Sequence, residues 1–171
     1  MIFLIITVVI LQLLLFVVIF GSNSTKAGVV KFKKYLDEHQ LPYQFDKVKN
    51  KPYKYVLTTP NAQYAVLFIS VPDHSEIILN SQTTWELRYG ADNTPGKIHP
   101  YKRYLTQIPK FLNADNSLKK LVVFTPNPKK IAMYINECEM KLITPTSTPY
   151  GITIIGDQQY DIFFENIQID K

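Results

Sequence analysis

The turn at residues 72–76, PDHSE, contains the side chains of this sequence that most resemble a catalytic set. Asp73, His74 and Glu76 place two carboxylates and an imidazole within a few positions, and such groups bind divalent metal ions. Together with Glu86 in the next segment, Asp73 and Glu76 could bind Mg²⁺ and activate a water for phosphodiester hydrolysis. Proline, aspartate and serine are, however, also what a tight turn requires. We expect an exposed hairpin tip and no metal site, with the Mg²⁺ site as the alternative.

Two pairs of basic residues stand near the starts of predicted helices. Apolar side chains at helical spacing predict helices over residues 100–108 and 128–142, and each begins at a proline. The basic pairs are Lys102 with Arg103, and Lys129 with Lys130. Free amide hydrogens and basic side chains at a helix start favour a bound phosphate or carboxylate. Each pair is a candidate anion-binding site; the alternative is solvated surface charge, or ion pairs with distant acids.

The elements that must position these residues follow an apolar N-terminus. Residues 1–20 contain no charged side chain, and a helix of this length crosses a hydrocarbon core of about 30 Å. A cleaved signal peptide would need a basic start, a shorter apolar run and a small-residue cleavage site. We therefore predict a retained single-pass transmembrane anchor over residues 1–21, in preference to a signal peptide or a buried core helix.

The excess positive charge lies directly behind this segment. Residues 26–54 contain eight lysines and three acidic residues, which accounts for the net charge of +5 of the whole chain, whereas residues 55–171 are balanced. Positive charge beside a spanning helix marks the cytoplasmic side. The lysines nearest the anchor are Lys26, Lys31, Lys33 and Lys34. We expect them to lie against anionic lipid headgroups, where each contributes about 1 kcal/mol; alternatively they only set topology and solubility.

The rest of the pattern predicts a single α/β (α+β) domain with a mixed central sheet flanked by helices. A basic segment with an amphipathic helix, residues 22–52, precedes a cytoplasmic domain, residues 53–171, on which that helix should pack. The predicted order is α-β-β-β-α-β-α-β. The helices are 26–40, 100–108 and 128–142, and the strands are 53–59, 63–71, 76–80, 120–125 and 151–155. The lone cysteine, Cys138, allows no intramolecular disulfide, which agrees with a cytoplasmic domain.

This order of elements, with Trp85 after the three strands and the segments HPYKRYLTQIPKFL and KKLVVFTPN further on, resembles the restriction-endonuclease-like (PD-(D/E)XK) superfamily. The likeness is to the nuclease-related domain of membrane-anchored bacterial proteins in particular. The resemblance implies a metal-dependent nuclease fold, with an acid on the second strand and an E-x-K pair on the third; the carboxylates bind Mg²⁺ and the lysine assists the attacking water. Residues 53–59 and 64–71 contain no carboxylate, so the chain resembles a nuclease fold without its catalytic residues.

The function predicted from these features is a non-catalytic binding or scaffold domain at the inner face of the cell membrane. Its expected partners are the membrane, with its anionic headgroups, and another protein, and no cofactor is expected. One alternative is a Mg²⁺-dependent nuclease or phosphodiesterase that uses Asp73, Glu76 and Glu86. A second alternative is nucleic-acid binding without hydrolysis, against which the balanced charge of residues 55–171 argues.

Overall fold

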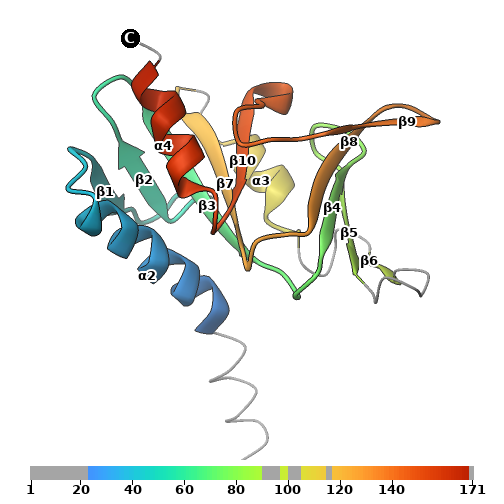
Figure 1. Ribbon diagram of the computed structural model, residues 1–171, viewed down its shortest axis with the longest axis horizontal. Helices are drawn as coiled ribbons and strands as arrows, with labels where there is room; N and C mark the ends of the chain where they lie inside the picture. Colours follow the sequence, from blue (N-terminus) through green and yellow to red (C-terminus); the bar gives the residue numbers. More distant parts are fainter. Residues whose placement is uncertain (1–22, 90–96, 100–104, 115–116, 170–171) are drawn as a thin grey trace, which may run out of the picture.

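Helix α2 (Asn23–Glu38) is the first element of the part of the chain that the computed structural model describes, residues 23–89, 97–99, 105–114 and 117–169 (Figure 1). Its apolar residues recur at spacings of three and four, so Val29, Phe32 and Leu36 share one face, and all three are buried. The lysines between them are exposed. The amphipathic helix predicted over residues 26–40 is therefore confirmed.

Helix α2 packs against a five-stranded mixed sheet whose strand order is β1-β2-β3-β7-β10. Its strands are β1 (Gln44–Lys47), β2 (Tyr55–Thr58), β3 (Gln63–Ser70), β7 (Lys119–Thr125) and β10 (Ile152–Gly156). The first three form an antiparallel meander, and β7 and β10 continue the sheet parallel to β3. As its apolar run predicted, β3 is central and buried on both faces. The carboxyl ends of β3, β7 and β10 therefore meet at one edge.

A second five-stranded sheet has the order β6-β5-β4-β8-β9. Its strands are β4 (Glu76–Leu79), β5 (Trp85–Tyr89), β6 (Lys97–His99), β8 (Lys130–Asn136) and β9 (Glu139–Leu142). The central pair, β4 and β8, is parallel, and the outer strands pair antiparallel with them. The prediction of one central sheet is thus wrong, although a single α+β domain with mixed sheets is confirmed.

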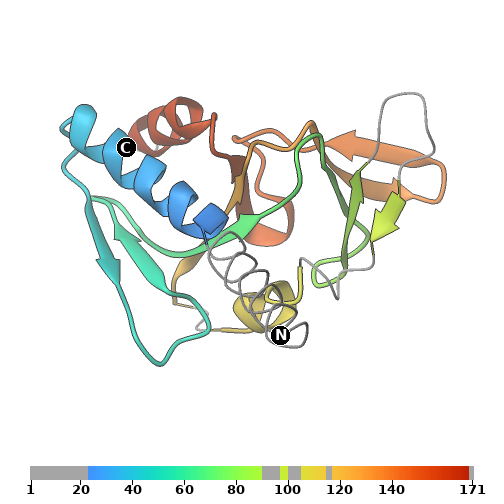
Figure 2. The same cartoon turned by 90° about the horizontal axis from the view of Figure 1, so that it is seen from below.

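Two apolar layers hold these elements together. Helices α2 and α4 (Tyr160–Ile169) cover one face of the first sheet, whereas α3 (Ile108–Leu112) lies against its other face (Figure 2). The layer under α2 and α4 is rich in aromatic rings, among them Phe32, Phe68 and Phe164. The layer on the α3 side also contains Trp85 and its neighbours from the second sheet, so it joins the two sheets.

The turn at residues 72–76 is a crossing between the two sheets, and the hairpin predicted there is wrong. Strand β3 pairs with β2 and β7, whereas β4 pairs with β5 and β8. The connection from β7 to β8 runs beside it, because the Val71 N–H donates to the Thr125 carbonyl and the Lys129 N–H donates to the Ser75 carbonyl. Both edges of β3 are occupied by β2 and β7, and both edges of β4 by β5 and β8, so no edge of either strand remains for a β3–β4 hairpin.

The helix predicted over residues 128–142 is also wrong, because these residues form the β8–β9 hairpin. Its first strand, KIAMYIN, is rich in β-branched and aromatic residues, and its apolar positions fit alternation as well as helical spacing. The hairpin turns at Asn136, whose side-chain oxygen accepts from the Cys138 N–H at 3.0 Å. This asparagine turn is the sequence signal that contradicts a continuous helix.

Two further predictions fall wholly or partly outside the described residues. Residues 100–104 of the predicted helix 100–108 lie outside the described residues, and the rest of that prediction is wrong: residues 105–107 form no helix, and α3 begins only at Ile108, because Pro109 is favoured in a first helical turn. The predicted anchor, residues 1–21, also lies outside them. Among the described helices none is long and apolar enough to cross a membrane.

Candidate functional site

A cavity of about 420 Å³ opens beside the N-terminal half of α2. It is bounded by α2, the β1–β2 hairpin, β3 and the residue Gln107 just before α3. Four of its lining residues are lysines, namely Lys26, Lys47, Lys51 and Lys54, and the described lining contains no carboxylate. Charge of one sign around a concave surface focuses the electrostatic potential there. The lysine-lined cavity, as we call it, is therefore a candidate site for an anion.

The hollow exists because β2 is shorter than β3. The last residue pair of the two strands is Tyr55 with Val66, and in the described part of the chain no strand pairs with this side of β3 beyond that point. Leu67 and Phe68 both line the cavity, although neighbouring residues of a strand point to opposite faces. The cavity therefore lies at the open edge of the sheet and includes the strand backbone.

The β1–β2 hairpin brings three of the four lysines to this edge, Lys47 from the end of β1 and Lys51 and Lys54 from the loop. The Val48 N–H donates to the Lys54 carbonyl at 2.9 Å, which closes the loop between them. Asn50 has a φ of 60°, a left-handed conformation that asparagine adopts more readily than most residues. Tyr53 is buried in the core and fixes the loop to the body of the domain. Because the loop is short and anchored, its lysines stay close together, which they would not do in a flexible linker.

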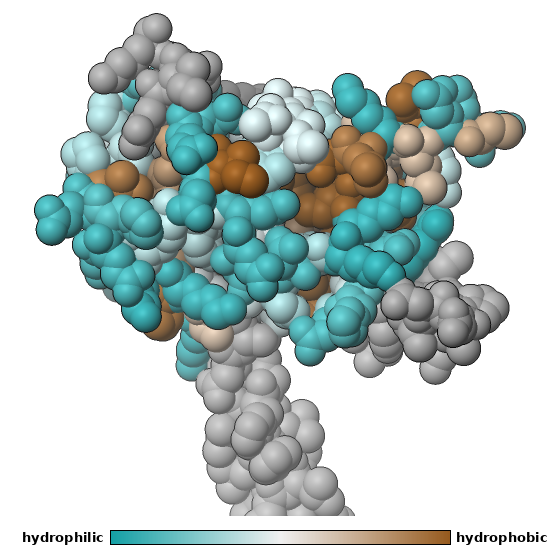
Figure 3. All heavy atoms as spheres, in the orientation of Figure 1, coloured by the Kyte–Doolittle hydropathy of each residue, from teal (hydrophilic) through white to brown (hydrophobic). Residues whose placement is uncertain are grey.

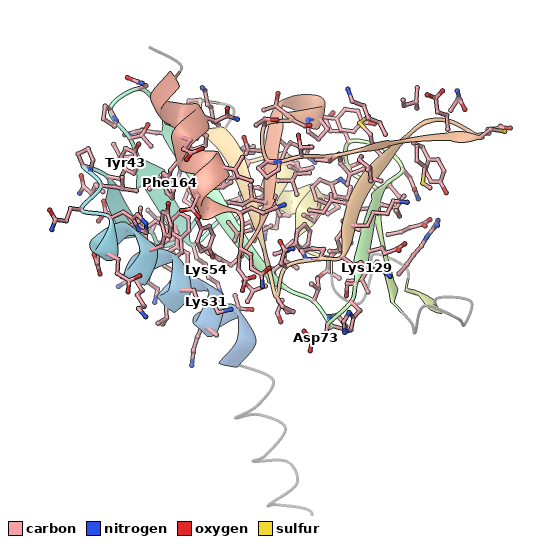
Figure 4. The ribbon with its side chains drawn as sticks, in the orientation of Figure 1. Lys31, Tyr43, Lys54, Asp73, Lys129 and Phe164 are labelled. Carbon is pink, nitrogen blue, oxygen red and sulfur yellow. The ribbon has the colours of Figure 1, made fainter. Side chains whose placement is uncertain are left out.

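The lysines predicted to lie at the membrane surface have different roles in the structure. Lys26 lines the cavity, Lys31 pairs with Asp157 at 2.7 Å, Lys33 lies over the Phe45 ring, and Lys34 pairs with Glu38 at 3.4 Å. All four are exposed, and Figure 3 shows hydrophilic side chains over the outer surface of α2. Lys31 and Lys54, labelled in Figure 4, come from two elements of this basic side of the molecule.

A second polar group lies where the parallel strands end. Ser70 and Thr125 are paired in register, and Asp157 follows β10 next to Thr125, since its N–H donates to the Phe124 carbonyl at 3.0 Å. The side chain of Asp157 is only 1 % exposed, and the Lys31 ammonium neutralises it from α2. In parallel sheets this carboxyl edge is where ligands commonly bind.

Several buried oxygen atoms at this edge have no hydrogen-bond partner among the described residues. They are Thr125 Oγ1, Asn127 Oδ1, Asp157 Oδ1 and Tyr160 Oη. Burial, together with the negative charge of Asp157, raises the pKa of the Tyr160 hydroxyl well above its usual value of 10.0, so it stays protonated. Each unpaired buried polar atom destabilises the fold by about 1–3 kcal/mol. The ion pair of Lys31 with Asp157 thus joins α2 to an edge that also contains these buried oxygen atoms.

The predicted metal ligands of the turn are not brought into one group. Asp73 and His74 are exposed, His74 with a φ of 58°, and Glu76 lies on β4 opposite Arg88. Glu86 on β5 accepts hydrogen bonds from Asn80 and Arg88. Among the described residues, no three side chains of the histidine, cysteine, aspartate or glutamate type form a group that could bind a metal.

Of the two basic pairs, only Lys129 with Lys130 belongs to the described residues, and this pair does not lie at a helix N-terminus. Lys129 and Lys130 stand at the start of strand β8, so the helix end on which an anion site was predicted there is absent. Asp73 and Lys129, labelled in Figure 4, lie on the two connections that cross between the sheets. Lys102 and Arg103 lie outside the described residues.

Sequence reasoning counted Lys47, Lys51 and Lys54 within a basic segment but did not identify them as a site. The missing step was strand β1, whose sequence QFDK has only one apolar residue and gives almost no strand signal. Asp157 was missed as well, although an acid directly after a buried parallel strand is a usable signal. Comparison of the chain with protein-family models, curated proteins and solved structures finds no significant match.

Proposed function

We propose that this protein is a single-pass, membrane-anchored cytoplasmic domain that binds, without catalysis, the anionic surface of the membrane through the lysines of α2 and the β1–β2 hairpin. One observation supports this proposal above the others. All eight lysines between residues 26 and 54 have exposed side chains, and they belong to folded elements at one side of the domain. At about 1 kcal/mol for each lysine near anionic lipid, together they are sufficient for firm binding.

The position of α2 relative to the apolar segment gives this charge its direction. Helix α2 begins at Asn23, directly after the predicted span of residues 1–21. Because its apolar face is buried in the core, the helix does not act as a flexible stalk. In the proposed arrangement its first turn and the lysine-lined cavity are the parts of the domain closest to the headgroups.

The likeness to a nuclease fold belongs to the same proposal. The meander predicted over residues 53–80 is not formed, because β4 belongs to the second sheet; the likeness is supported instead by α2, the meander of β1–β3 and the parallel strand β7. Neither β2 nor β3 contains a carboxylate. We therefore propose a member of that superfamily that has kept the arrangement and lost the chemistry.

The single exposed cysteine gives a direct test of the side of the membrane. Cys138 lies at the turn of the β8–β9 hairpin and is exposed. A maleimide that cannot cross membranes should label Cys138 in opened cells and not in intact ones. Labelling of intact cells would place the domain outside and contradict the proposal, as would a full-length chain that stays soluble without detergent.

Charge-dependent contact with lipid needs a separate measurement. The full chain in nanodiscs of phosphatidylcholine, with or without phosphatidylglycerol, is exposed to a lysine-acetylating reagent and each lysine is read by mass spectrometry. The lysines of residues 26–54 should be protected in the anionic discs, and salt should remove the protection because it screens the attraction. Lys141, exposed on β9 of the second sheet, is the internal control. Equal acetylation in the two kinds of disc would contradict the proposed function.

A further inference from the structure

The lysine-lined cavity differs in kind from a flat basic surface. Its lysines come from three parts of the fold: Lys26 from α2, Lys47 from β1, and Lys51 and Lys54 from the hairpin loop. The other exposed lysines of this side, such as Lys33 and Lys49, are not among the residues that line it. Four of the eight lysines therefore line the cavity, where they can contact one bound group together. The other four lie outside it and can contact only a flat partner such as a membrane surface.

The size and composition of the cavity restrict what it can bind. A volume of about 420 Å³ lies within the range of about 300–1,000 Å³ that is usual for small-molecule sites. Its charged rim is combined with an apolar wall formed by Val29, Val66 and Phe68, and Thr25 and Gln107 add neutral polar groups. This combination suits a compact ligand with one strongly anionic group and a short carbon skeleton.

The charge of the cavity favours a phosphate over a carboxylate. Lysine ammonium groups act on an anion as point charges, and at neutral pH a phosphate monoester carries about 1.5–2 negative charges whereas a carboxylate carries about one. No arginine is among the described residues that line the cavity. A zwitterionic headgroup would bring its own cation against four ammonium groups, so phosphatidylcholine should be excluded.

From these observations we propose that the lysine-lined cavity is a stoichiometric binding site for one phosphate monoester on a small polar skeleton, such as glycerol phosphate. The proposal rests on the proposed function in that it names the anionic group bound at this side of the domain. The phosphate can belong to a lipid headgroup or to a free metabolite, because the chemistry of recognition is the same.

The test uses the full chain in phosphatidylcholine nanodiscs, titrated with glycerol 3-phosphate in a calorimeter. The site variant is Lys51→Glu with Lys54→Glu, and the matched control is Lys33→Glu with Lys49→Glu, which changes the net charge equally outside the cavity. Wild type should bind one equivalent, the site variant about thirtyfold more weakly, and the control less than about threefold more weakly. Thr25→Trp, an uncharged change at an exposed lining position, should also weaken binding because it narrows the cavity.

A second arm distinguishes the two sources of phosphate. The discs then also contain phosphatidic acid. If the natural ligand is a lipid headgroup, phosphatidic acid should compete with glycerol 3-phosphate and weaken its binding. If the natural ligand is a free metabolite, the affinity for glycerol 3-phosphate should stay unchanged. Absence of saturable binding in wild type, or equal loss in the site variant and the control, would overturn the proposed cavity site. Failure of the proposed function has a different result, because lysines then acetylate equally in anionic and neutral discs while calorimetric binding persists.

Discussion

The Lys31 ammonium lies 2.7 Å from the carboxylate of Asp157, and this ion pair joins the middle of α2 to the carboxyl end of β10. The two residues contribute unequally, since the side chain of Lys31 is 57 % exposed whereas that of Asp157 is 1 % exposed. The aspartate therefore depends on the lysine more than the lysine depends on it.

Removing the lysine should destabilise the fold, because it leaves a buried carboxylate without its counter-charge. We expect Lys31→Met to lower the free energy of unfolding by about 2 kcal/mol, less than for a fully buried pair because water reaches this lysine. Lys34→Met, which breaks the exposed pair with Glu38, should lower it by about 0.5 kcal/mol at most. Urea unfolding of the full chain in detergent measures both. Equal effects of the two changes would show that Asp157 does not require Lys31.

Two threonines with opposite surroundings test the polar edge. Thr125 Oγ1 is buried without a partner, so Thr125→Val, which keeps the shape, should be neutral or stabilising. In contrast, Thr59 Oγ1 donates to the Ala62 carbonyl at 2.9 Å and accepts from the Ala62 N–H at 3.0 Å. Thr59→Val should therefore lower the free energy of unfolding by about 1–2 kcal/mol. If Thr125→Val is the more damaging of the two, a bound molecule contacts Thr125 in solution.

The close approach of α2 to β7 makes Gly28 sensitive to substitution. A Cβ atom at Gly28 would lie near the Thr125 hydroxyl, at 2.4 Å from Oγ1, so Gly28→Ala forces helix and strand apart. We expect Gly28→Ala to lower the free energy of unfolding by about 1–3 kcal/mol. The second change Thr125→Ala should restore part of this stability, because it removes the hydroxyl oxygen with which the new Cβ atom collides. A double variant whose loss is the simple sum of the two single losses would contradict this explanation.

Alkaline pH should weaken the domain through Tyr35 and Tyr160. Burial raises the pKa of both hydroxyls above 10.0, for Tyr35 with a further contribution from its hydrogen bond to Asp161. A group whose pKa is raised on folding stabilises the fold fully below its unfolded pKa, and that stabilisation is lost as pH rises toward its folded pKa. The thermal midpoint should thus fall above about pH 10, and less steeply in Tyr160→Phe. An equally steep fall in that variant would contradict the role of Tyr160.

Magnesium should neither stabilise the protein nor activate it, because the carboxylates of Asp73, Glu76 and Glu86 do not form a group. The measurement compares the thermal midpoint with and without Mg²⁺, together with hydrolysis of DNA and RNA by the full chain. Asp73→Ala should behave as wild type in both assays. Mg²⁺-dependent hydrolysis that Asp73→Ala abolishes would instead support the relocated metal site.

The sequence predicted those elements whose pattern allows a single interpretation. The amphipathic pattern of α2 and the unbroken apolar runs of β3, β7 and β10 each fit one type of structure, and all four are in the fold. The β8–β9 hairpin was missed because its apolar residues fit two periodicities. The second sheet could not be inferred, because no local signal says whether β4 pairs with β3 or crosses to other strands.

From the sequence, the candidate site could be recognised only as an excess of positive charge. A count of lysines identified the basic segment, but the cavity depends on where β2 stops along β3, which is a matter of tertiary structure. Asp157 became significant only when Lys31 was found beside it, at a separation of 126 residues. Long-range pairs of this kind leave no trace in a single sequence.

The attachment of α2 to the core also determines how the domain moves. Its face is fixed by ring contacts of Phe32 with Phe68, Tyr160 and Phe164, by the Lys31 ion pair and by the tight contact at Gly28. A helix fixed in this way cannot pivot independently of the sheets. Any tilt or rotation of α2 would therefore reorient the entire domain as a rigid body, including the β8–β9 hairpin of the second sheet.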